Sequence, residues 1–371
     1  MGFTSRKILI NSSIYASANL FAWGLNTSGQ LGTGTITNRS SPVQIGSLSW
    51  SQVSAGGAYT LAIRSDGLLF AWGLNTSGQL GDGTITNRSS PVQIGSLSWT
   101  QVSAGGSHAL AIRSDGLLFA WGINNYGQIG DGTNIGKSSP VQIGSLSWNQ
   151  VSASGTQVGA YTSGAFSQAI RSDGLLFAWG QNALGQLGDG NTTDKSSPVQ
   201  IGSLSWTKVS AGVSHALAIR SDGLLFAWGD NTSGQIGDGT TTSRLLAVQI
   251  GSLSWTQVSA GENYTQAIRS DGLLFAWGLN SSGQLGTGTI TNRSSPVQIG
   301  SLSWTQVSAK NSYTQAIRSN GLLFAWGLNS SGQLGDGTNI GKSSPVQIGS
   351  LSWTQVSAGE RSTQAIKFIA P

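Results

Sequence analysis

The chain has 371 residues and a formal net charge of +5 at pH 7, and only 9% of its residues are charged. It contains no cysteine, which excludes disulfides and thiolate chemistry. Its apolar runs are too short to cross a membrane. Its 54 glycines stand at fixed places between short β-rich runs, which indicates turns rather than low-complexity disorder.

The first residues resemble a signal peptide only in part. Two basic residues precede the apolar segment Ile8–Ile10, but the polar residues Asn11–Ser13 interrupt it, so export is not predicted. Asn-x-Ser/Thr sequons, as at Asn26 and Asn38, recur in nearly every repeat and would be glycosylated in a eukaryotic secretory route. We therefore expect a bacterial, viral or cytosolic origin, with the protein in the cytoplasm or in a virion.

A repeat organises the rest of the chain. A tryptophan in the motif LFAWG recurs at spacings of 49, 49, 58, 49, 49 and 49 residues, and a second tryptophan, in SLSW, keeps the same spacing. The first series is Trp23, Trp72, Trp121, Trp179, Trp228, Trp277 and Trp326, and the second is Trp50, Trp99, Trp148, Trp206, Trp255, Trp304 and Trp353. Self-similarity at such a period indicates a propeller, a solenoid or an array.

Each repeat is expected to contain four short strands, which we name A to D in chain order. In the repeat that begins at Gln101 they are Val102–Ala104, His108–Ile112, Leu117–Trp121 and Pro140–Ile143. Ser114–Gly116 forms a tight turn between B and C, a long loop joins C to D, and Gly144–Trp148 crosses to the next strand A. Four antiparallel strands of this kind make one blade of a β-propeller.

The chain starts and ends within a blade. Its first strands are of types C and D, at Leu20–Trp23 and Pro42–Ile45, and its last are of types A and B, at Val356–Ala358 and Thr363–Ile369. Joining these halves hides the edges that an open array would expose. The predicted fold is therefore an all-β, seven-bladed propeller over residues 20–371, preceded by an N-terminal arm, residues 1–19, in which Arg6–Ile10 could add a short outer strand.

The motifs resemble the regulator of chromosome condensation repeat. The residues that carry the resemblance are WG-x-N-x-x-G-Q-[LI]-G, as in Trp72–Gly81, then P-V-x-I, V-S-A-G and A-I-x-x-x-G. The resemblance covers nearly the whole chain and implies a seven-bladed β-propeller. Members of that family include guanine-nucleotide exchange factors, a plant ultraviolet-B photoreceptor, ligase-associated modules and a secreted bacterial β-lactamase inhibitor, so the fold does not decide the function.

The chain departs from the family's pattern in ways that bear on function. The photoreceptor's Gly-Trp-Arg-His-Thr signature is absent, which disfavours light sensing. The exchange factor's wedge follows the Trp-Gly pair, whereas the insertion here, near Ser154–Gly164, lies between strands A and B. The histidine that often begins strand B is present only at His108 and His215. The other repeats place Tyr59, Phe166, Tyr264, Tyr313 and Ser362 there.

Binding residues are expected on one face of the propeller. In an up-and-down blade the A–B and C–D loops emerge on one side, here called the variable face, and the B–C turns (RSDG) and D–A connections (GSLSW) on the other, the uniform face. Aromatic and charged residues on loops of a rigid scaffold favour recognition of a partner. The predicted partner-binding residues, expected to ring the mouth of a central channel, are Tyr59, His108, Tyr161, His215, Glu262, Tyr264, Lys310, Tyr313, Glu360 and Arg361.

Other charged residues are expected to be structural. Each C–D loop carries one basic residue, at Arg39, Arg88, Lys137, Lys195, Arg244, Arg293 and Lys342. Most of these loops also contain an aspartate, so local pairing is a better interpretation than a nucleic-acid surface. An arginine before each Ser-Asp-Gly or Ser-Asn-Gly turn, as at Arg64, is interpreted as a contact that stabilises the turn.

The sequence predicts no catalytic, cofactor or metal site. Gly132–Ser138 resembles a phosphate-binding loop, but three residues separate its glycines where the motif needs four. His108 and His215 are too far apart in the ring to form a catalytic pair. We therefore interpret the chain as a non-catalytic scaffold for a protein or glycan partner, without a membrane or nucleic-acid role. The alternative is a self-associating assembly component, such as a phage tail or fibre protein or a surface adhesin, and nucleotide exchange is disfavoured.

Overall fold

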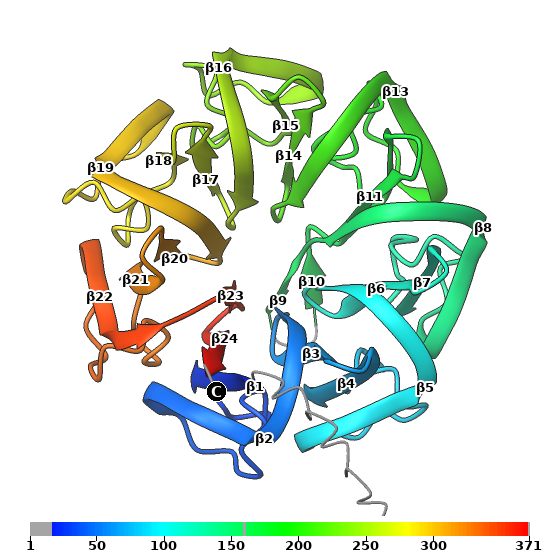
Figure 1. Cartoon of the computed structure of the whole chain (residues 1–371). Helices are drawn as coiled ribbons and strands as arrows, with labels where there is room; N and C mark the ends of the chain where they lie inside the picture. The colour runs from blue at the N-terminus through cyan, green and yellow to red at the C-terminus, as the bar shows by residue number, and fades with distance from the viewer. Residues whose placement is uncertain (1–16, 159–160, 370–371) are drawn as a thin grey trace, which may run out of the picture.

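A computed structural model describes residues 17–158 and 161–369. Over these residues the chain is all β, and it contains no helix long and apolar enough to cross a membrane. Blades are arranged as a ring around a central axis (Figure 1). The predicted strand at Arg6–Ile10 lies outside the described residues, and β1 (Ser17–Gly24) begins at the end of the predicted arm.

The strands repeat in a fixed order. Strand B is β3 (Tyr59–Arg64), β6 (His108–Arg113), β11 (Phe166–Arg171), β14 (His215–Arg220), β17 (Tyr264–Arg269) and β20 (Tyr313–Arg318). Strand C is β4 (Leu68–Gly73), β7 (Leu117–Gly122), β12 (Leu175–Gly180), β15 (Leu224–Gly229), β18 (Leu273–Gly278) and β21 (Leu322–Gly327). Long strands join the blades: β2 (Arg39–Ala55), β5 (Arg88–Ala104), β8 (Lys137–Ala153), β13 (Lys195–Ala211), β16 (Arg244–Ala260) and β19 (Arg293–Lys310).

These long strands correct the expectation that strands D and A are separate. The first part of β5 pairs with β4 of one blade, and its second part pairs with β6 of the next. The crossing residues are held from both sides, because Trp99 N donates to Gly67 O at 2.8 Å and Ser98 O accepts from Ser114 N at 2.9 Å. The chain therefore stays within the sheets where the sequence suggests a separate connection, although the pairing register shifts there and Gly95 has a positive φ of 61°.

Two half blades close the ring, as predicted. The last strands are β22 (Lys342–Ser352), β23 (Gln355–Ala358) and β24 (Ser362–Ile369). β24 pairs antiparallel with β1 over eight residues, from Ser17 opposite Ile369 to Gly24 opposite Ser362. β1 pairs in turn with the first part of β2, so the two ends of the chain share one four-stranded blade. Within the described residues, β1 and β24 are therefore paired along their whole length where the two ends meet.

The core lies between blades. One cluster combines Tyr59, Leu61 and Ile63 of β3 with Phe119 and Trp121 of β7 in the next blade. At such a junction the SLSW tryptophan of one repeat meets the LFAWG tryptophan of the next, with ring centroids 6.0 Å apart for Trp50 and Trp72. Contacts of this kind recur around the ring and bury the C strands on both sides.

The WG-x-N motif recurs from repeat to repeat because its asparagine and tryptophan hold the C–D loops in place. The Asn75 side chain is buried; its Oδ1 accepts from Leu80 N at 3.0 Å and its Nδ2 donates to the carbonyls of Thr84 and Thr86. Trp72 Nε1 donates to Gln30 O in the C–D loop of the neighbouring blade at 3.0 Å. One asparagine thus folds each loop, and one tryptophan fixes it against the next blade.

Candidate binding site at the mouth of the propeller

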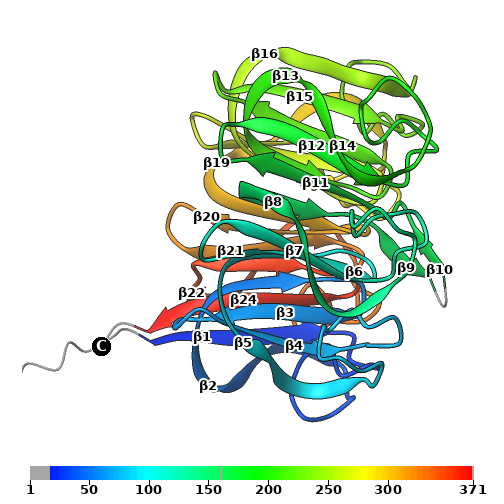
Figure 2. The ribbon, with the colours of Figure 1, turned by 90° about the vertical axis from the view of Figure 1, so that its right-hand side faces the viewer.

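The two faces of the ring differ in what they offer a ligand. In the side view, the hairpin of β9 (Thr156–Val158) and β10 (Tyr161–Ser163) lies on one side of the ring and the described C-terminus on the other (Figure 2). This hairpin is the insertion predicted between strands A and B, and it extends from the variable face. The described chain therefore begins and ends on the uniform face, where Ser17 pairs with Ile369.

The uniform face is built from one repeated turn. Arg64 pairs with Asp66 at 2.5 Å and lies over the Phe70 ring at 5.1 Å from its centroid. The same ion pair recurs in four further described turns and is absent where Asn320 follows Arg318. The structural interpretation is confirmed for the five arginines that pair with the aspartate of their own turn, and Arg318 lies over the Phe324 ring at 5.7 Å from its centroid.

Five of the predicted partner-binding residues are in the wrong environment for that role. Tyr59, His108, His215, Tyr264 and Tyr313 are fully buried, with 0% of each residue exposed. Their position at the start of strand B directs them into the junction between blades rather than toward the central axis. The prediction that they ring the mouth is therefore wrong, and they belong to the core.

Hydrogen bonds show what the buried side chains do. Tyr59 OH donates to His108 O at 2.5 Å, and Tyr313 OH donates to Ser362 O at 2.7 Å. Glycine at the end of strand A makes room for the ring, since a Cβ on Gly56 would lie 2.3 Å from Tyr59 Cε1. Burial raises the pKa of the Tyr59 and Tyr313 hydroxyls, so both remain neutral donors.

The two histidines are held neutral in the same way. His108 Nε2 lies 3.0 Å from Ser167 Oγ, and His215 Nε2 lies 3.1 Å from Thr265 Oγ1. Burial lowers the pKa of His108 to about 3, and the nearby Lys310 charge acts in the same direction. Burial lowers the pKa of His215 to about 4, opposed by Asp230. Both rings join neighbouring blades and are unsuited to proton transfer at neutral pH.

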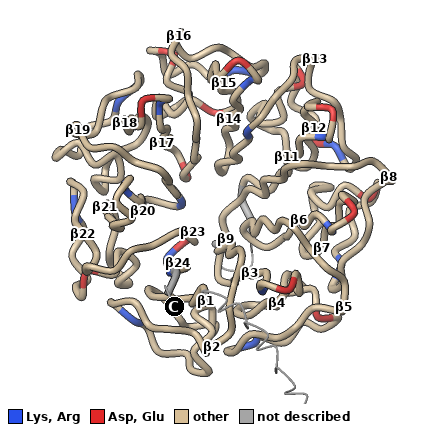
Figure 3. The backbone as a smooth tube through the Cα atoms, viewed as in Figure 1, with Lys and Arg blue, Asp and Glu red and all other residues tan. Residues whose placement is uncertain are grey.

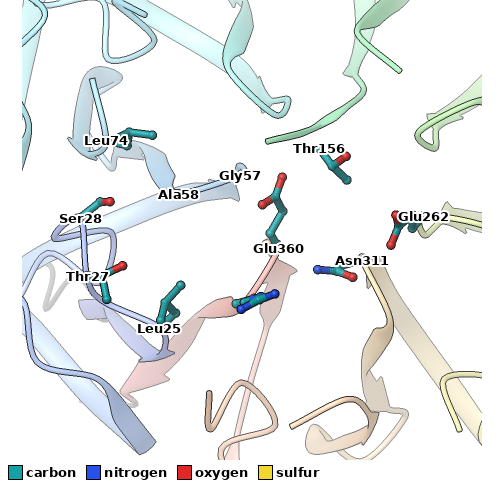
Figure 4. Close-up of a pocket in the computed structure, with 11 residues that line it drawn as sticks. Leu25, Thr27, Ser28, Gly57, Ala58, Leu74, Thr156, Glu262, Asn311 and Glu360 are labelled. Carbon is teal, nitrogen blue, oxygen red and sulfur yellow. The ribbon is translucent and has the colours of Figure 1, made fainter. Parts of the chain in front are cut away.

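A cavity of about 460 Å³ opens at the mouth of the ring on the variable face. It brings together three predicted residues: Glu262, which follows β16, and Glu360 and Arg361, which lie between β23 and β24. Figure 4 shows Glu360 extending into the opening, with Thr156, Glu262 and Asn311 around it. Tyr161 lies in β10, and its side chain is outside the described part of the chain.

Backbone hydrogen bonds hold the loops that carry the charged groups of this mouth. Glu262 N donates to Asn311 O at 3.1 Å, and Glu360 N donates to Gly56 O at 3.2 Å, so each loop is joined to the next blade. Burial raises the pKa of Glu262. Burial also lowers the pKa of Lys310, while the nearby Glu360 carboxylate opposes that shift. The mouth therefore presents charges of both signs at fixed positions.

The sequence prediction missed Asn311 and Thr156. Asn311 has a φ of 46°, and among the described residues it is the one non-glycine with a positive φ. It lies in a two-residue turn closed by the pairing of Lys310 with Tyr313, and asparagine tolerates this conformation better than most residues. The sequence did contain a signal for this turn, because Lys310 replaces the glycine that stands at Gly56 and at most of its equivalents.

The outer rim of the variable face is less basic than the lysine and arginine count suggests. Five C–D loops pair their basic residue with an aspartate, as in Arg88 with Asp82 at 2.9 Å. Arg39 and Arg293 make no such pair among the described residues, because Thr33 and Thr287 replace the aspartate. Figure 3 shows positive and negative groups interspersed around the ring. Local pairing, as predicted, leaves no dense basic patch in the described structure.

The outer rim of the variable face also carries exposed isoleucines, which were not predicted from the sequence. Five C–D loops each carry one that is 66–68% exposed. These residues are Ile36, Ile85, Ile135, Ile290 and Ile340. Apolar side chains therefore surround a polar and charged mouth. Among the described residues, no group of three or more histidine, aspartate or glutamate side chains could hold a metal ion.

Comparisons with known proteins identify the repeat. A family model described as the Regulator of chromosome condensation (RCC1) repeat matches residues 17–63, 66–112, 115–161, 173–219, 222–268, 271–317 and 320–366. A second model with the same description matches five segments between residues 50 and 333. A comparison with curated proteins found no match.

Solved structures share the architecture. Human WBSCR16 is 21% identical with a TM-score of 0.84, over 95% of this chain and 99% of that one. Prp20p from Saccharomyces cerevisiae, described with its binding to Gsp1p and histones, is 20% identical with a TM-score of 0.84, over 96% and 93%. Yeast RCC1 (Prp20) bound to Kap60 is 19% identical with a TM-score of 0.83, over 100% and 95%. At these identities the likeness shows the fold alone, whereas the seven matched repeats show that the chain belongs to the regulator of chromosome condensation (RCC1) repeat family.

Proposed function

We propose that this propeller is a non-catalytic scaffold that binds a protein partner at the mouth of the variable face. The observation that carries the proposal is the concentration of unique charged loops at one cavity. Glu262, Asn311 and the Glu360–Arg361 pair interrupt an otherwise uniform repeat there, and Thr156 of hairpin β9–β10 lines the same cavity.

The scaffold favours recognition because these groups need little ordering on binding. Their backbones are hydrogen-bonded from blade to blade, and the core beneath them is fully buried. A preorganised surface loses less conformational entropy on association than mobile loops do. Binding residues on loops of a rigid framework are typical of recognition domains.

A protein partner fits the chemistry of this face better than a glycan does. Glycan sites commonly use exposed aromatic rings, but Tyr59, Tyr264 and Tyr313 are buried. The exposed isoleucines instead surround a polar mouth, and a protein surface can contact both at once. Two structural neighbours, both yeast Prp20, are described with protein ligands: Gsp1p and histones for one, Kap60 for the other.

Affinity capture from the native source tests the proposal. The test variant combines Glu262→Gln, Glu360→Gln and Arg361→Gln, which remove charge at the mouth while keeping side-chain size. The matched control is Asp66→Asn on the uniform face, beside Arg64. A partner that binds wild type and control, and is lost from the folded triple variant, supports the proposal. Equal capture by all three proteins contradicts it.

Two competing functions give different results in simple assays. An assembly component would self-associate, and light scattering would then show a mass that rises with concentration in the purified protein without a partner. An exchange factor would accelerate nucleotide release from a small GTPase of the native source. If the proposal is correct, the protein is a monomer and does not stimulate nucleotide release. The reason is that the insertion lies between strands A and B, whereas the described loops after the Trp-Gly pairs are equal in length and similar in sequence.

A further inference from the structure

Two tiers of side-chain hydrogen bonds join the A strands around the central axis. In the first tier a serine hydroxyl accepts from the backbone N–H of an alanine in the next blade, at 2.8–3.0 Å. This tier is complete at all seven junctions. Ser54 with Ala104 is one example, and Ser357 with Ala55 closes the circle.

The second tier uses a glutamine two residues before each serine, and it is incomplete. At four junctions the glutamine Oε1 accepts from a valine N–H at 2.7–3.0 Å, as Gln52 does from Val102. At three consecutive junctions no side chain among the described residues accepts from the equivalent N–H groups of Val209, Val258 and Val307. One side of the tier is therefore closed, and the other has free donors.

A single replacement lies at the centre of the open side. Lys208 occupies the position that is glutamine in the other six blades. A lysine ammonium only donates hydrogen bonds, so it cannot accept from Val258 N–H as a glutamine would. On either side, Gln150 Oε1 is buried without a partner, and Gln257 Nε2 donates to Thr305 O instead. The replacement adds a positive charge where an acceptor is missing.

A cavity of about 440 Å³ lies beside this lysine on the uniform face. Gln101, Gln150 and Lys208 line it from three neighbouring A strands. The one carboxylate in its lining, Asp173, is paired with Arg171 at 2.5 Å. Lys208 itself makes no ion pair among the described residues, so its charge is available to a ligand in the cavity.

We propose that the open side of this tier is a binding site for a small oxyanion, such as a phosphate group or a carboxylate. Lys208 is its charged anchor, and its hydrogen-bond donor is the backbone N–H of Val209, which follows Lys208 and lacks the glutamine acceptor that Gln150 would supply. The anion supplies the acceptor oxygens that glutamine supplies in the complete part of the tier. This site lies on the uniform face, so it is independent of the partner-binding mouth proposed above.

Isothermal titration calorimetry at constant ionic strength tests this inference. Inorganic phosphate and succinate are titrated separately into wild type, Lys208→Gln and Lys137→Gln. Lys208→Gln restores the residue of the other blades, so the variant is expected to fold. Lys137→Gln is the matched control, since it removes the same charge from a lysine paired with Asp131.

We expect one-site binding of at least one anion to wild type, an affinity at least tenfold lower in Lys208→Gln, and an unchanged affinity in the control. Phosphate binding without succinate binding would identify a phosphate-type ligand, and the reverse a carboxylate-type ligand. Absence of saturable binding of both anions to wild type would overturn the proposal. Equal binding by wild type and Lys208→Gln, or equal losses in both variants, would overturn it as well.

Discussion

Lowering the pH from 8 to 5 should destabilise this propeller through His108 and His215. Both histidines are fully buried and neutral in the folded protein, with pKa values lowered to about 3 and about 4. The unfolded chain binds protons at the ordinary value of 6.5, so it takes up more protons than the folded state as the pH falls below that value. Their contribution to stability is therefore complete above pH 6.5 and is lost progressively at lower pH.

The size of the effect follows from proton linkage. Each pH unit between the two pKa values costs about 1.4 kcal/mol per group, so at pH 5 each histidine costs about 2 kcal/mol and the pair about 4 kcal/mol. Hydrogen bonds from the adjacent arginines lower the pKa values of Asp66 and its equivalents. The stability that these aspartates contribute is lost only when the pH falls below the ordinary pKa of aspartate, so they do not affect the comparison between pH 8 and pH 5. Glu262 has a raised pKa and acts in the opposite direction, which reduces the net loss slightly.

Urea unfolding at pH 8 and pH 5 measures this loss. The test variant is His108→Phe with His215→Phe, because phenylalanine occupies the same position at Phe166. The double variant lacks the hydrogen bonds to Ser167 and Thr265, which should lower its free energy of unfolding by about 1 kcal/mol each at any pH. Because it has no buried histidine, its free energy of unfolding should change much less with pH than that of wild type. Tyr59→Phe, which removes a buried hydroxyl that does not titrate in this range, is the control and should keep the pH dependence of wild type. An equal fall in the free energy of unfolding for wild type and double variant would refute the reasoning.

Three further changes test the closure and packing of the ring. Removal of residues 357–371 deletes β24, the partner of β1, and should lower the melting temperature of the whole protein; an unchanged temperature would show that the ring does not depend on its closing blade. Gly32→Ala should lower the free energy of unfolding by about 2 kcal/mol or more, since φ of Gly32 is +77° and the new Cβ would lie 2.7 Å from Trp72 Nε1. A free energy of unfolding in urea within about 0.5 kcal/mol of the wild-type value would contradict this. Ser54→Ala should cost about 1 kcal/mol by leaving the N–H of Ala104 without its acceptor, and a neutral result in the same assay would argue against a role for the serine tier in stability.

The fold could be predicted because its determinants are periodic. The spacing of the tryptophans gives the number of blades, and the C–D start and A–B end of the chain give the closure, which the pairing of β1 with β24 confirms. The long strands could not be predicted in the same way. Their crossing residues, as at Gly95–Trp99, have the composition of a turn, and Gly95 does have a positive φ. The crossing nevertheless stays within the sheets because two neighbouring blades bind its backbone at Ser98 and Trp99.

The site was predicted in part, and the errors have a physical origin. Tyr59 lies two residues before Leu61 and four before Ile63, so alternation along a strand places all three on one side, in the core. That pattern outweighs the loop position that suggested exposure. Glu262, Glu360 and Arg361 lie beyond the strand ends and do line the cavity. Their meeting with Thr156 and Asn311 depends on the ring geometry, which no single repeat reveals.

Hydrogen–deuterium exchange on the complex with a captured partner is the most direct test of partner binding at the variable face. We predict slower exchange at hairpin β9–β10 and in the loops that carry Glu262, Asn311 and Glu360, with the Arg64–Gly67 turn and its equivalents unchanged. Slower exchange confined to those turns on the uniform face would contradict the proposed binding mode.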